Sequence, residues 1–202
     1  MKEQKPIELG AEIISWLFFP PLVATVFFVF LIFWYSQDLS QGLQWLTYVA
    51  PFLIFIPLVF FALSYKLHWI SDVDLTKRSE RPAFLIVFTV SLAIASAIMY
   101  LLQAPEKFVI YIFSGLIMVI LASIITFYWK ISFHTMVTTS VVSAIVIIGG
   151  LRFWPFFLLL PIIAWARIVL KKHSLYQVIG GVFLSAAITW SVFALFGFRL
   201  FY

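Results

Sequence analysis

The chain consists of apolar runs that are each about as long as a bilayer is thick, joined by short polar connections. A helix rises 1.5 Å per residue, so about 20 apolar residues are needed to cross a hydrocarbon core of about 30 Å. The predicted fold class is therefore an all-α integral membrane protein, a polytopic bundle of seven transmembrane helices, with six possible. The runs lie at 11–35, 44–65, 83–102, 107–129, 133–150, 151–170 and 175–198.

Composition agrees with a membrane protein and excludes other classes. Hydrophobic residues make up 64% of the chain and charged residues 10%, and the mean hydropathy is +1.13, far from the values of soluble domains. The absence of cysteine removes thiolate metal sites and thiol nucleophiles. The net charge of +5 does not indicate a nucleic-acid partner, because the basic residues lie in short loops rather than along one stripe.

Two sequence features predict irregularities in the helices. Pro20 and Pro21 should kink or break the first run, and Gly149-Gly150 should join the fifth and sixth runs in a tight hairpin. We expect no cleaved signal peptide, because the first ten residues are polar and the first apolar run is too long for one.

Basic residues are distributed unequally between the two sides of the membrane that seven helices define. One side holds the connections 1–10, 66–82, 130–132 and 171–174. Its basic residues are Lys2, Lys5, Lys66, Lys77, Arg78, Arg81, Lys130, Arg167, Lys171 and Lys172, against Lys107, Arg152 and Arg199 on the other side. Without Arg78, Arg81 and Arg167, which could bind a ligand, seven remain against three, and the positive-inside rule predicts that this side is cytoplasmic.

Three polar islands return to that same side because pairs of helices separate them. They contain "DVDLTKRSERP" at 72–82, "KISFH" at 130–134 and "RIVLKKH" at 167–173. Ionisable residues at membrane depth usually mark a functional path or site. Taken singly, each island has a plainer interpretation: a solvated loop, an interfacial His134 bonded to a neighbouring helix, an Arg167 that snorkels to the surface, or an exposed His173.

The residue types in the islands suit phosphate chemistry. Arginine, lysine and helix N-termini provide the fixed donors that a phosphate needs. A neutral imidazole can attack phosphorus, and a protonated one can give a proton to the leaving alkoxide. Ser132 is also a good N-cap residue for the helix that follows it, which would place free N–H groups beside His134.

In this combination the sequence resembles the type 2 phosphatidic acid phosphatases, also called lipid phosphate phosphatases. Their motifs run Lys-x6-Arg-Pro, Ser-Gly-His and Arg-x5-His-x3-Asp on a six-helix membrane core, in the order of the three islands. The resemblance covers about 66–180 and implies a core at 66–202, with motif islands at 66–82, 130–135 and 167–177. Residues 1–65 would then hold an N-terminal tail and two accessory transmembrane helices.

The resemblance also implies roles for individual residues. His173 corresponds to the nucleophile and His134 to the general acid, whereas Arg81, Arg167 and Ser132 correspond to phosphate-binding residues. The implied reaction is hydrolysis of a lipid phosphate or prenyl diphosphate through a phosphohistidine, with no metal and no cofactor. The implied partners are that substrate and the membrane lipids.

Three positions depart from the family's pattern. Asp74 stands where the first motif has lysine, and Lys77 or Arg78 could substitute for it. Phe133 replaces the glycine of the second motif. Gln177 replaces the aspartate that orients the nucleophile, and it could orient His173 through its carbonyl or only complete a capping box with Ser174.

Two functions therefore remain open at this point. One is a membrane phosphatase. The other is a non-enzymatic lipid-phosphate-binding or carrier protein with the same cationic pocket, although paired broken helices typical of transporters are not evident in the sequence.

Overall fold

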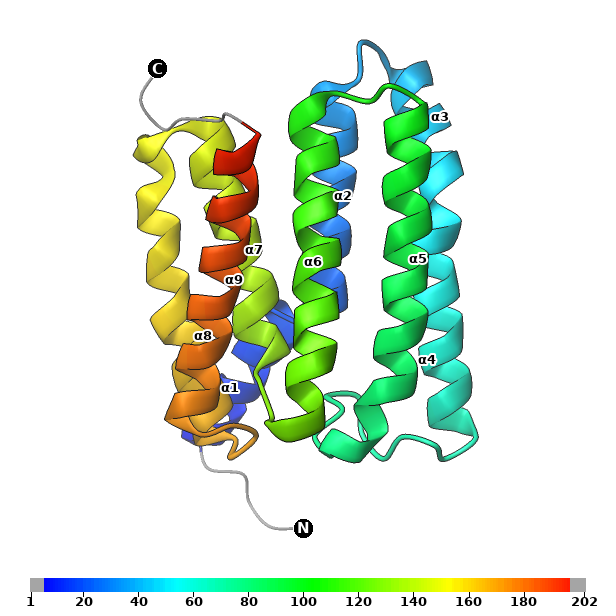
Figure 1. Ribbon diagram of the computed structural model, residues 1–202. Helices are drawn as coiled ribbons and strands as arrows, with labels where there is room; N and C mark the ends of the chain where they lie inside the picture. The colour runs from blue at the N-terminus through cyan, green and yellow to red at the C-terminus, as the bar shows by residue number, and fades with distance from the viewer. Residues whose placement is uncertain (1–5, 197–202) are drawn as a thin grey trace. The chain divides into compact units, whose positions relative to one another are not determined.

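The structure is a computed structural model that describes residues 6–196, and every regular element within them is a helix (Figure 1). The elements are α1 (Pro6–Leu17), α2 (Pro20–Tyr35), α3 (Leu39–Ala50), η1 (Pro51–Phe55), α4 (Ile56–Lys66), η2 (Arg78–Glu80), α5 (Arg81–Leu101), α6 (Glu106–Tyr128), α7 (Phe133–Gly149), η3 (Leu151–Leu158), α8 (Leu159–Val169) and α9 (Leu175–Leu195). Lys2, Lys5, Arg199 and the predicted helix end at 198 lie outside the described residues.

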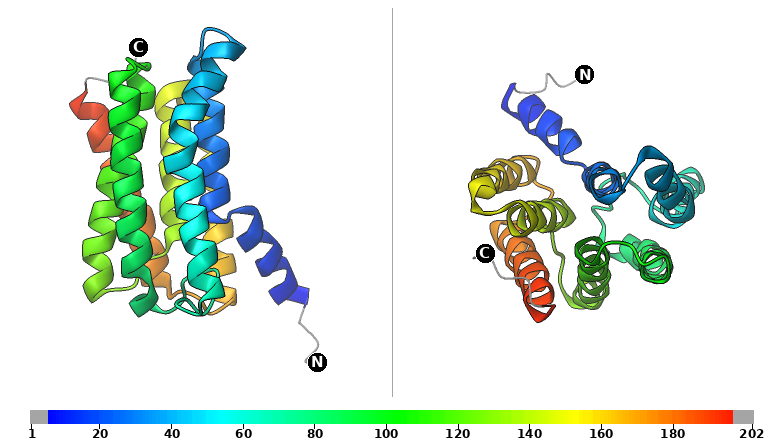
Figure 2. Two further views of the ribbon diagram at one scale, coloured as in Figure 1. Left: turned by 90° about the vertical axis from the view of Figure 1, so that its right-hand side faces the viewer. Right: turned by 90° about the horizontal axis from the view of Figure 1, so that it is seen from above.

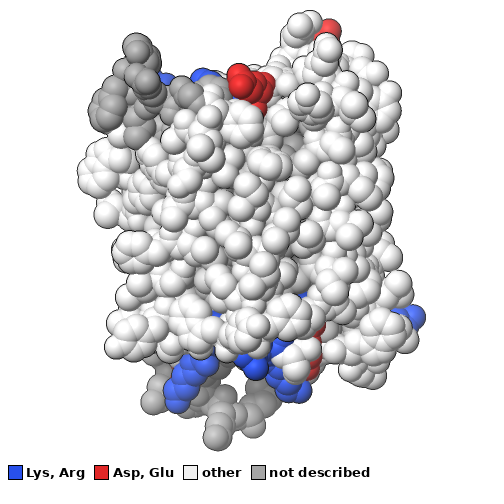
Figure 3. Space-filling view, viewed as in Figure 1, with Lys and Arg blue, Asp and Glu red and all other residues white. Residues whose placement is uncertain are grey.

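Six helical stretches of residues 6–196 are long and apolar enough to cross a membrane, and α7 is a shorter apolar helix. The six stretches are Pro6–Tyr35, Leu39–Lys66, Arg78–Leu101, Glu106–Tyr128, Leu151–Val169 and Leu175–Leu195. By length and composition, this confirms the predicted class of an all-helical, multi-pass membrane protein. On the face drawn in Figure 3, uncharged residues cover the helix middles and charged residues are confined to helix ends.

The second predicted helix begins earlier than the apolar pattern indicates, at Leu39 instead of residue 44. The reason is local capping. Asp38 is the N-cap, and its carboxylate accepts a hydrogen bond from the N–H of Gln41 at 2.8 Å. Further along, Pro51 lacks an N–H and would clash in a regular α-helix, and the helix passes it in the π-helical turn η1.

Contacts divide the described residues into two compact units, residues 27–130 and residues 6–26 with 131–196. In the first unit, α5 packs against α6 and α4. Leu85, Leu92 and Ala95 on α5 are buried, and Tyr111 of α6 packs edge-on against Phe27, with ring centroids 5.0 Å apart. The boundary predicted at residue 65 divides the chain by motif and stays a prediction.

The second unit carries the third predicted island and all of the second except Lys130. Here α7 packs against α9 and α8, and α1 lies against α8. The chain breaks between α1 and α2 at Pro20 and Pro21, as predicted, and Figure 2 shows the change of direction there. The hairpin after α7 is also confirmed, because Gly150 turns the chain with φ +95°, in the left-handed region that favours glycine.

Small polar side chains line the contact between α7 and α9. Ser185 donates a hydrogen bond to the carbonyl of Met136 at 2.6 Å, and Thr135 donates to the carbonyl of Val178 at 3.2 Å. Small residues allow helix backbones to approach closely in membranes. A Cβ atom at Gly181 would lie 2.9 Å from the carbonyl oxygen of Ser132, so this contact requires glycine.

Replacing Gly181 with alanine should therefore destabilise the protein, by roughly 1–3 kcal/mol as is typical of overpacking. The new methyl group would also lie 2.5 Å from Thr135 Oγ1. Thermal unfolding in detergent measures the effect. Gly10→Ala is the matched control, because a Cβ there meets nothing within 4 Å and alanine is the better helix former. Equal melting temperatures for the two variants would contradict the close contact.

Candidate functional site

Residues of the second and third islands lie at one end of their unit, where α7 and α9 begin and α8 ends (Figure 1). Ser132 is the N-cap of α7, and His134 is the second residue of that helix. Arg167 lies in the last turn of α8, and His173 immediately precedes Ser174, the N-cap of α9. Four of the predicted site residues in these islands, Ser132, His134, Arg167 and His173, are buried, and Gln177 is half-buried.

The turn after α8 places His173 next to the end of that helix. Lys171 adopts a left-handed backbone conformation with φ +54°. The chain thereby folds back, and the carbonyl oxygen of Arg167 accepts hydrogen bonds from the N–H groups of Lys172 at 3.1 Å and His173 at 3.3 Å. His173 is only 8% exposed and Arg167 only 1%, so neither the exposed-loop nor the snorkelling interpretation fits.

Gln177 makes both contacts that the sequence left open. The predicted capping box with Ser174 is present, with Gln177 N–H donating to Ser174 Oγ at 3.4 Å and Gln177 Oε1 accepting from the N–H of Ser174 at 3.3 Å. Gln177 Oε1 also lies 3.0 Å from His173 Nδ1. One side chain therefore caps α9 and contacts the imidazole of His173.

This double contact fixes the protonation pattern of the His173 ring. A backbone N–H only donates, so the amide atom that faces Ser174 must be the carbonyl oxygen of Gln177. The same oxygen faces His173 Nδ1, and an oxygen acceptor requires a hydrogen on that nitrogen. In the neutral ring, Nε2 then carries the lone pair that a nucleophile needs.

Ser132 connects the second island to the third. Its N–H donates to the carbonyl of Gln177 at 3.3 Å, and its own carbonyl accepts from Thr135 Oγ1 at 3.1 Å. The predicted N-cap position is confirmed, because Ser132 has extended backbone angles before α7, but its side chain makes no capping hydrogen bond. The Ser132 hydroxyl is buried and has no hydrogen-bond partner within residues 6–196.

A residue that sequence reasoning missed links Arg167 and His134. Arg167 Nη1 donates to Ser15 Oγ at 2.5 Å, and Ser15 Oγ lies 3.4 Å from His134 Nε2. Ser15 comes from α1 and is 7% exposed. The available signal was a polar residue inside the apolar stretch "IISWLFF", but such residues are common and do not by themselves indicate a partner.

The first island belongs to the other unit. Arg81 begins α5, is fully buried, and donates from Nε to the carbonyl of Leu75 at 2.9 Å. Leu75 has φ +48°, so the loop is turned to bring this carbonyl to the arginine. The position of Arg81 beside the two histidines stays a prediction.

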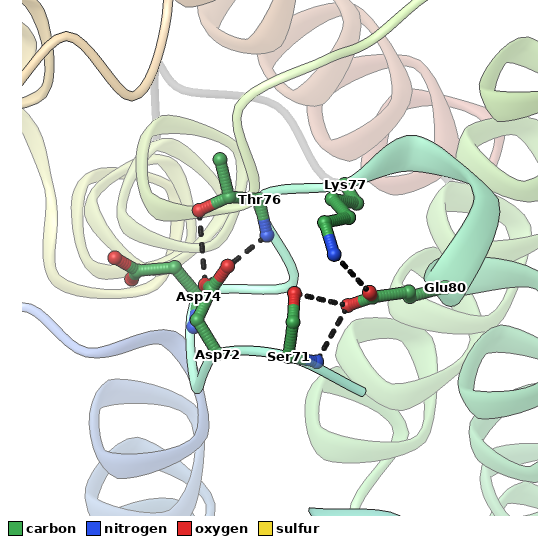
Figure 4. Close-up of polar contacts among 6 residues, drawn as sticks. All are labelled: Ser71, Asp72, Asp74, Thr76, Lys77 and Glu80. Carbon is green, nitrogen blue, oxygen red and sulfur yellow. Dashed lines mark hydrogen bonds and ion pairs between the residues drawn. The ribbon is translucent and has the colours of Figure 1, made fainter. Parts of the chain in front are cut away.

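Carboxylates organise the loop before Arg81 (Figure 4). Asp72 Oδ1 accepts hydrogen bonds from Thr76 Oγ1 at 2.9 Å and from the N–H of Asp74 at 2.9 Å. Glu80 accepts from Ser71 and forms an ion pair with Lys77, with 3.4 Å between Nζ and Oε1. Lys77 thus faces Glu80 in the structure.

The remaining proposed substitute for the family's lysine, Arg78, is exposed. Among residues 6–196, no three His, Cys, Asp or Glu side chains form a group that could hold a metal ion. No family model, curated protein or solved structure matches the chain.

Proposed function

We propose that the protein is an integral membrane phosphatase that hydrolyses a lipid phosphate or prenyl diphosphate through a phosphohistidine, as the resemblance to the lipid phosphate phosphatases implies. The observation that supports this best is the contact between Gln177 Oε1 and His173 Nδ1 at 3.0 Å. It leaves the lone pair of the neutral imidazole on Nε2, the form that can attack phosphorus.

The proposed reaction has two steps. In the first, His173 Nε2 forms a bond to phosphorus while the bond from phosphorus to the lipid oxygen breaks, and His134 gives its proton to that oxygen. In the second, water attacks the phosphohistidine, His134 takes the proton from the water, and the bond from phosphorus to His173 breaks. Inorganic phosphate leaves, and both histidines return to their starting states.

Phosphate binding in this proposal relies on fixed donors at the start of α7. The helix N-terminus offers backbone N–H groups with partial positive charge, and the hydroxyl of Ser132 is buried beside them. Arg167 would balance the charge on the phosphoryl oxygens. Arg81, Lys77 and Arg78 remain predicted phosphate-binding residues, and the lipid tail would lie against the aromatic-rich helices.

The same glutamine also favours a second function, in which the protein binds or carries a lipid phosphate without hydrolysing it. Gln177 carries no charge, so it cannot balance an imidazolium as a carboxylate would. Its oxygen is also shared with the cap of α9. A protein that only binds or carries a lipid phosphate would tolerate this substitution.

Phosphate release decides between the two functions. Purified protein in EDTA would be given phosphatidic acid, phosphatidylglycerol phosphate and prenyl diphosphates. The phosphatase proposal expects release from at least one of them, together with an acid-labile phosphoprotein after quenching. Binding of these lipids without release would support the carrier instead, and activity that EDTA abolishes would contradict the histidine mechanism.

We further propose that the site faces the cytoplasm, and the absence of cysteine makes this testable with single thiols. Ser40 and Ser79 are both exposed and lie near opposite ends of the helical stretch Leu39–Lys66. In intact cells, an impermeant maleimide should modify Ser40→Cys and leave Ser79→Cys unmodified until the cells are permeabilised. The reverse labelling pattern would show that the orientation is inverted.

Gln177→Glu should raise turnover by about tenfold. Glutamate has the length of glutamine and also suits a capping box, so both contacts can persist. Its negative charge would stabilise the His173 imidazolium. A stabilisation equivalent to one pKa unit corresponds to a change of about tenfold in turnover. Gln177→Leu is the control that removes both contacts, and Gln177→Asp restores the family's residue at shorter reach. No change in turnover with glutamate would indicate that Gln177 serves only as a cap.

A further inference from the structure

Ser15 of helix α1 lies next to the candidate site. It is buried where α1 packs against α8, and its hydroxyl contacts two residues of the candidate site. Those residues, His134 and Arg167, lie 119 and 152 positions away in the sequence. The break at Pro20 and Pro21 separates α1 from α2 and lets it lie along α8.

The hydrogen atoms at Ser15 can be assigned from the donors around it. A guanidinium only donates, so Ser15 Oγ accepts from Arg167 Nη1. The hydroxyl hydrogen can then point to His134 Nε2 when that nitrogen carries a lone pair. When His134 is protonated, Nε2–H can donate to the second lone pair of the same oxygen. Ser15 therefore fits both protonation states of His134 without losing Arg167.

We infer that Ser15 is a positioning residue that fixes the side chains of Arg167 and His134 relative to each other. Helix α1 is then part of the site. The inference rests on the proposed function and adds to it. Ser15 acts through the other two side chains: it fixes the guanidinium that neutralises phosphate charge and the imidazole that delivers the proton.

The test compares Ser15→Ala with Ser185→Ala in purified protein. Ser185 is also a buried helix serine of the same unit, and its hydroxyl bonds to the carbonyl of Met136 outside the candidate site. The substrates are phosphatidic acid, whose leaving alkoxide needs a proton, and an aryl phosphate with an acidic phenol. Losing a hydrogen bond to a charged group should lower kcat for phosphatidic acid by about 10- to 100-fold.

Ser15→Ala should lower turnover of the aryl phosphate by a smaller factor than turnover of phosphatidic acid, because part of its effect passes through the general acid. In a His134→Ala background, Ser15→Ala should cost much less than it does alone, because neighbouring residues of one network are not additive. Ser185→Ala should change turnover of both substrates by the same small factor. If Ser15→Ala does not fold, Ser15→Cys takes its place, since it is close in volume and only a weak donor.

The outcomes separate this inference from the proposed function. Wild-type hydrolysis with equal factors for Ser15→Ala and Ser185→Ala on both substrates would overturn the role of Ser15 and keep the phosphatase. If wild-type protein binds phosphatidic acid in nanodiscs without hydrolysis, at least tenfold weaker binding by Ser15→Ala would still support its positioning of Arg167, and unchanged binding would overturn it. A wild-type protein that neither binds nor hydrolyses phosphatidic acid, phosphatidylglycerol phosphate or a prenyl diphosphate would overturn both.

Discussion

Alanine at position 173 should abolish phosphate release from every substrate, lipid or aryl, with a loss of about 10⁴–10⁶-fold. The reason is that His173 is the proposed nucleophile, and its removal eliminates the covalent route whatever the leaving group. The rate of inorganic phosphate release measures this loss. The acid-labile phosphoprotein seen with wild-type protein should be absent from the variant as well.

Binding and folding provide the controls for His173→Ala. The variant should still bind phosphatidic acid, because Arg167 and the N-terminus of α7 remain in place. Ser174 and Gln177 should still cap α9, so thermal unfolding should change little. Residual turnover close to the wild-type value would contradict the role of His173 as nucleophile.

The second large effect concerns His134. His134→Ala should lower turnover of phosphatidic acid by about 10²–10⁴-fold, the usual contribution of a general acid. It should be much milder on an aryl phosphate, because an acidic phenol leaves without a proton. Comparing kcat/KM for the two substrates on a logarithmic scale gives the size of this rescue, because kcat/KM covers the first step and not the later step in which His134 takes a proton from water.

The pattern across the two histidine variants separates catalysis from binding. Catalysis predicts one loss that is independent of the leaving group, for His173, and one that depends on it, for His134. Equal losses in both variants on both substrates, with lipid-phosphate binding also lost, would indicate that the two histidines bind the substrate and are neither the nucleophile nor the general acid.

Most of the helix framework could be predicted because the bilayer imposes one length on apolar segments. The fourth run, predicted at 107–129, forms α6 at Glu106–Tyr128. The start of α3 was missed because its first turn, "LSQG", is polar and is specified by Asp38 rather than by hydropathy. The helix break at Pro20 and Pro21 was predicted correctly because a proline ring restricts the backbone at its own position.

Within the candidate site, contacts between residues close in the sequence could be predicted, and contacts between distant residues could not. Ser174 and Gln177 form a capping box that depends only on their spacing, and the contact from His173 to Gln177 spans one helical turn. Ser15 is different, because its partner Arg167 is 152 residues away and only packing of α1 on α8 brings them together. No local pattern carries that information.

The distance along the chain between Ser15 and Arg167 also bears on biogenesis. At about 5–20 residues per second, synthesis of the intervening 152 residues takes roughly 8–30 s. Throughout that interval Ser15 has been synthesised but its partner Arg167 has not. Arg167, His134 and Ser15 can contact one another only after α8 has been synthesised and has packed on α1, so a chain truncated before α8 lacks this contact.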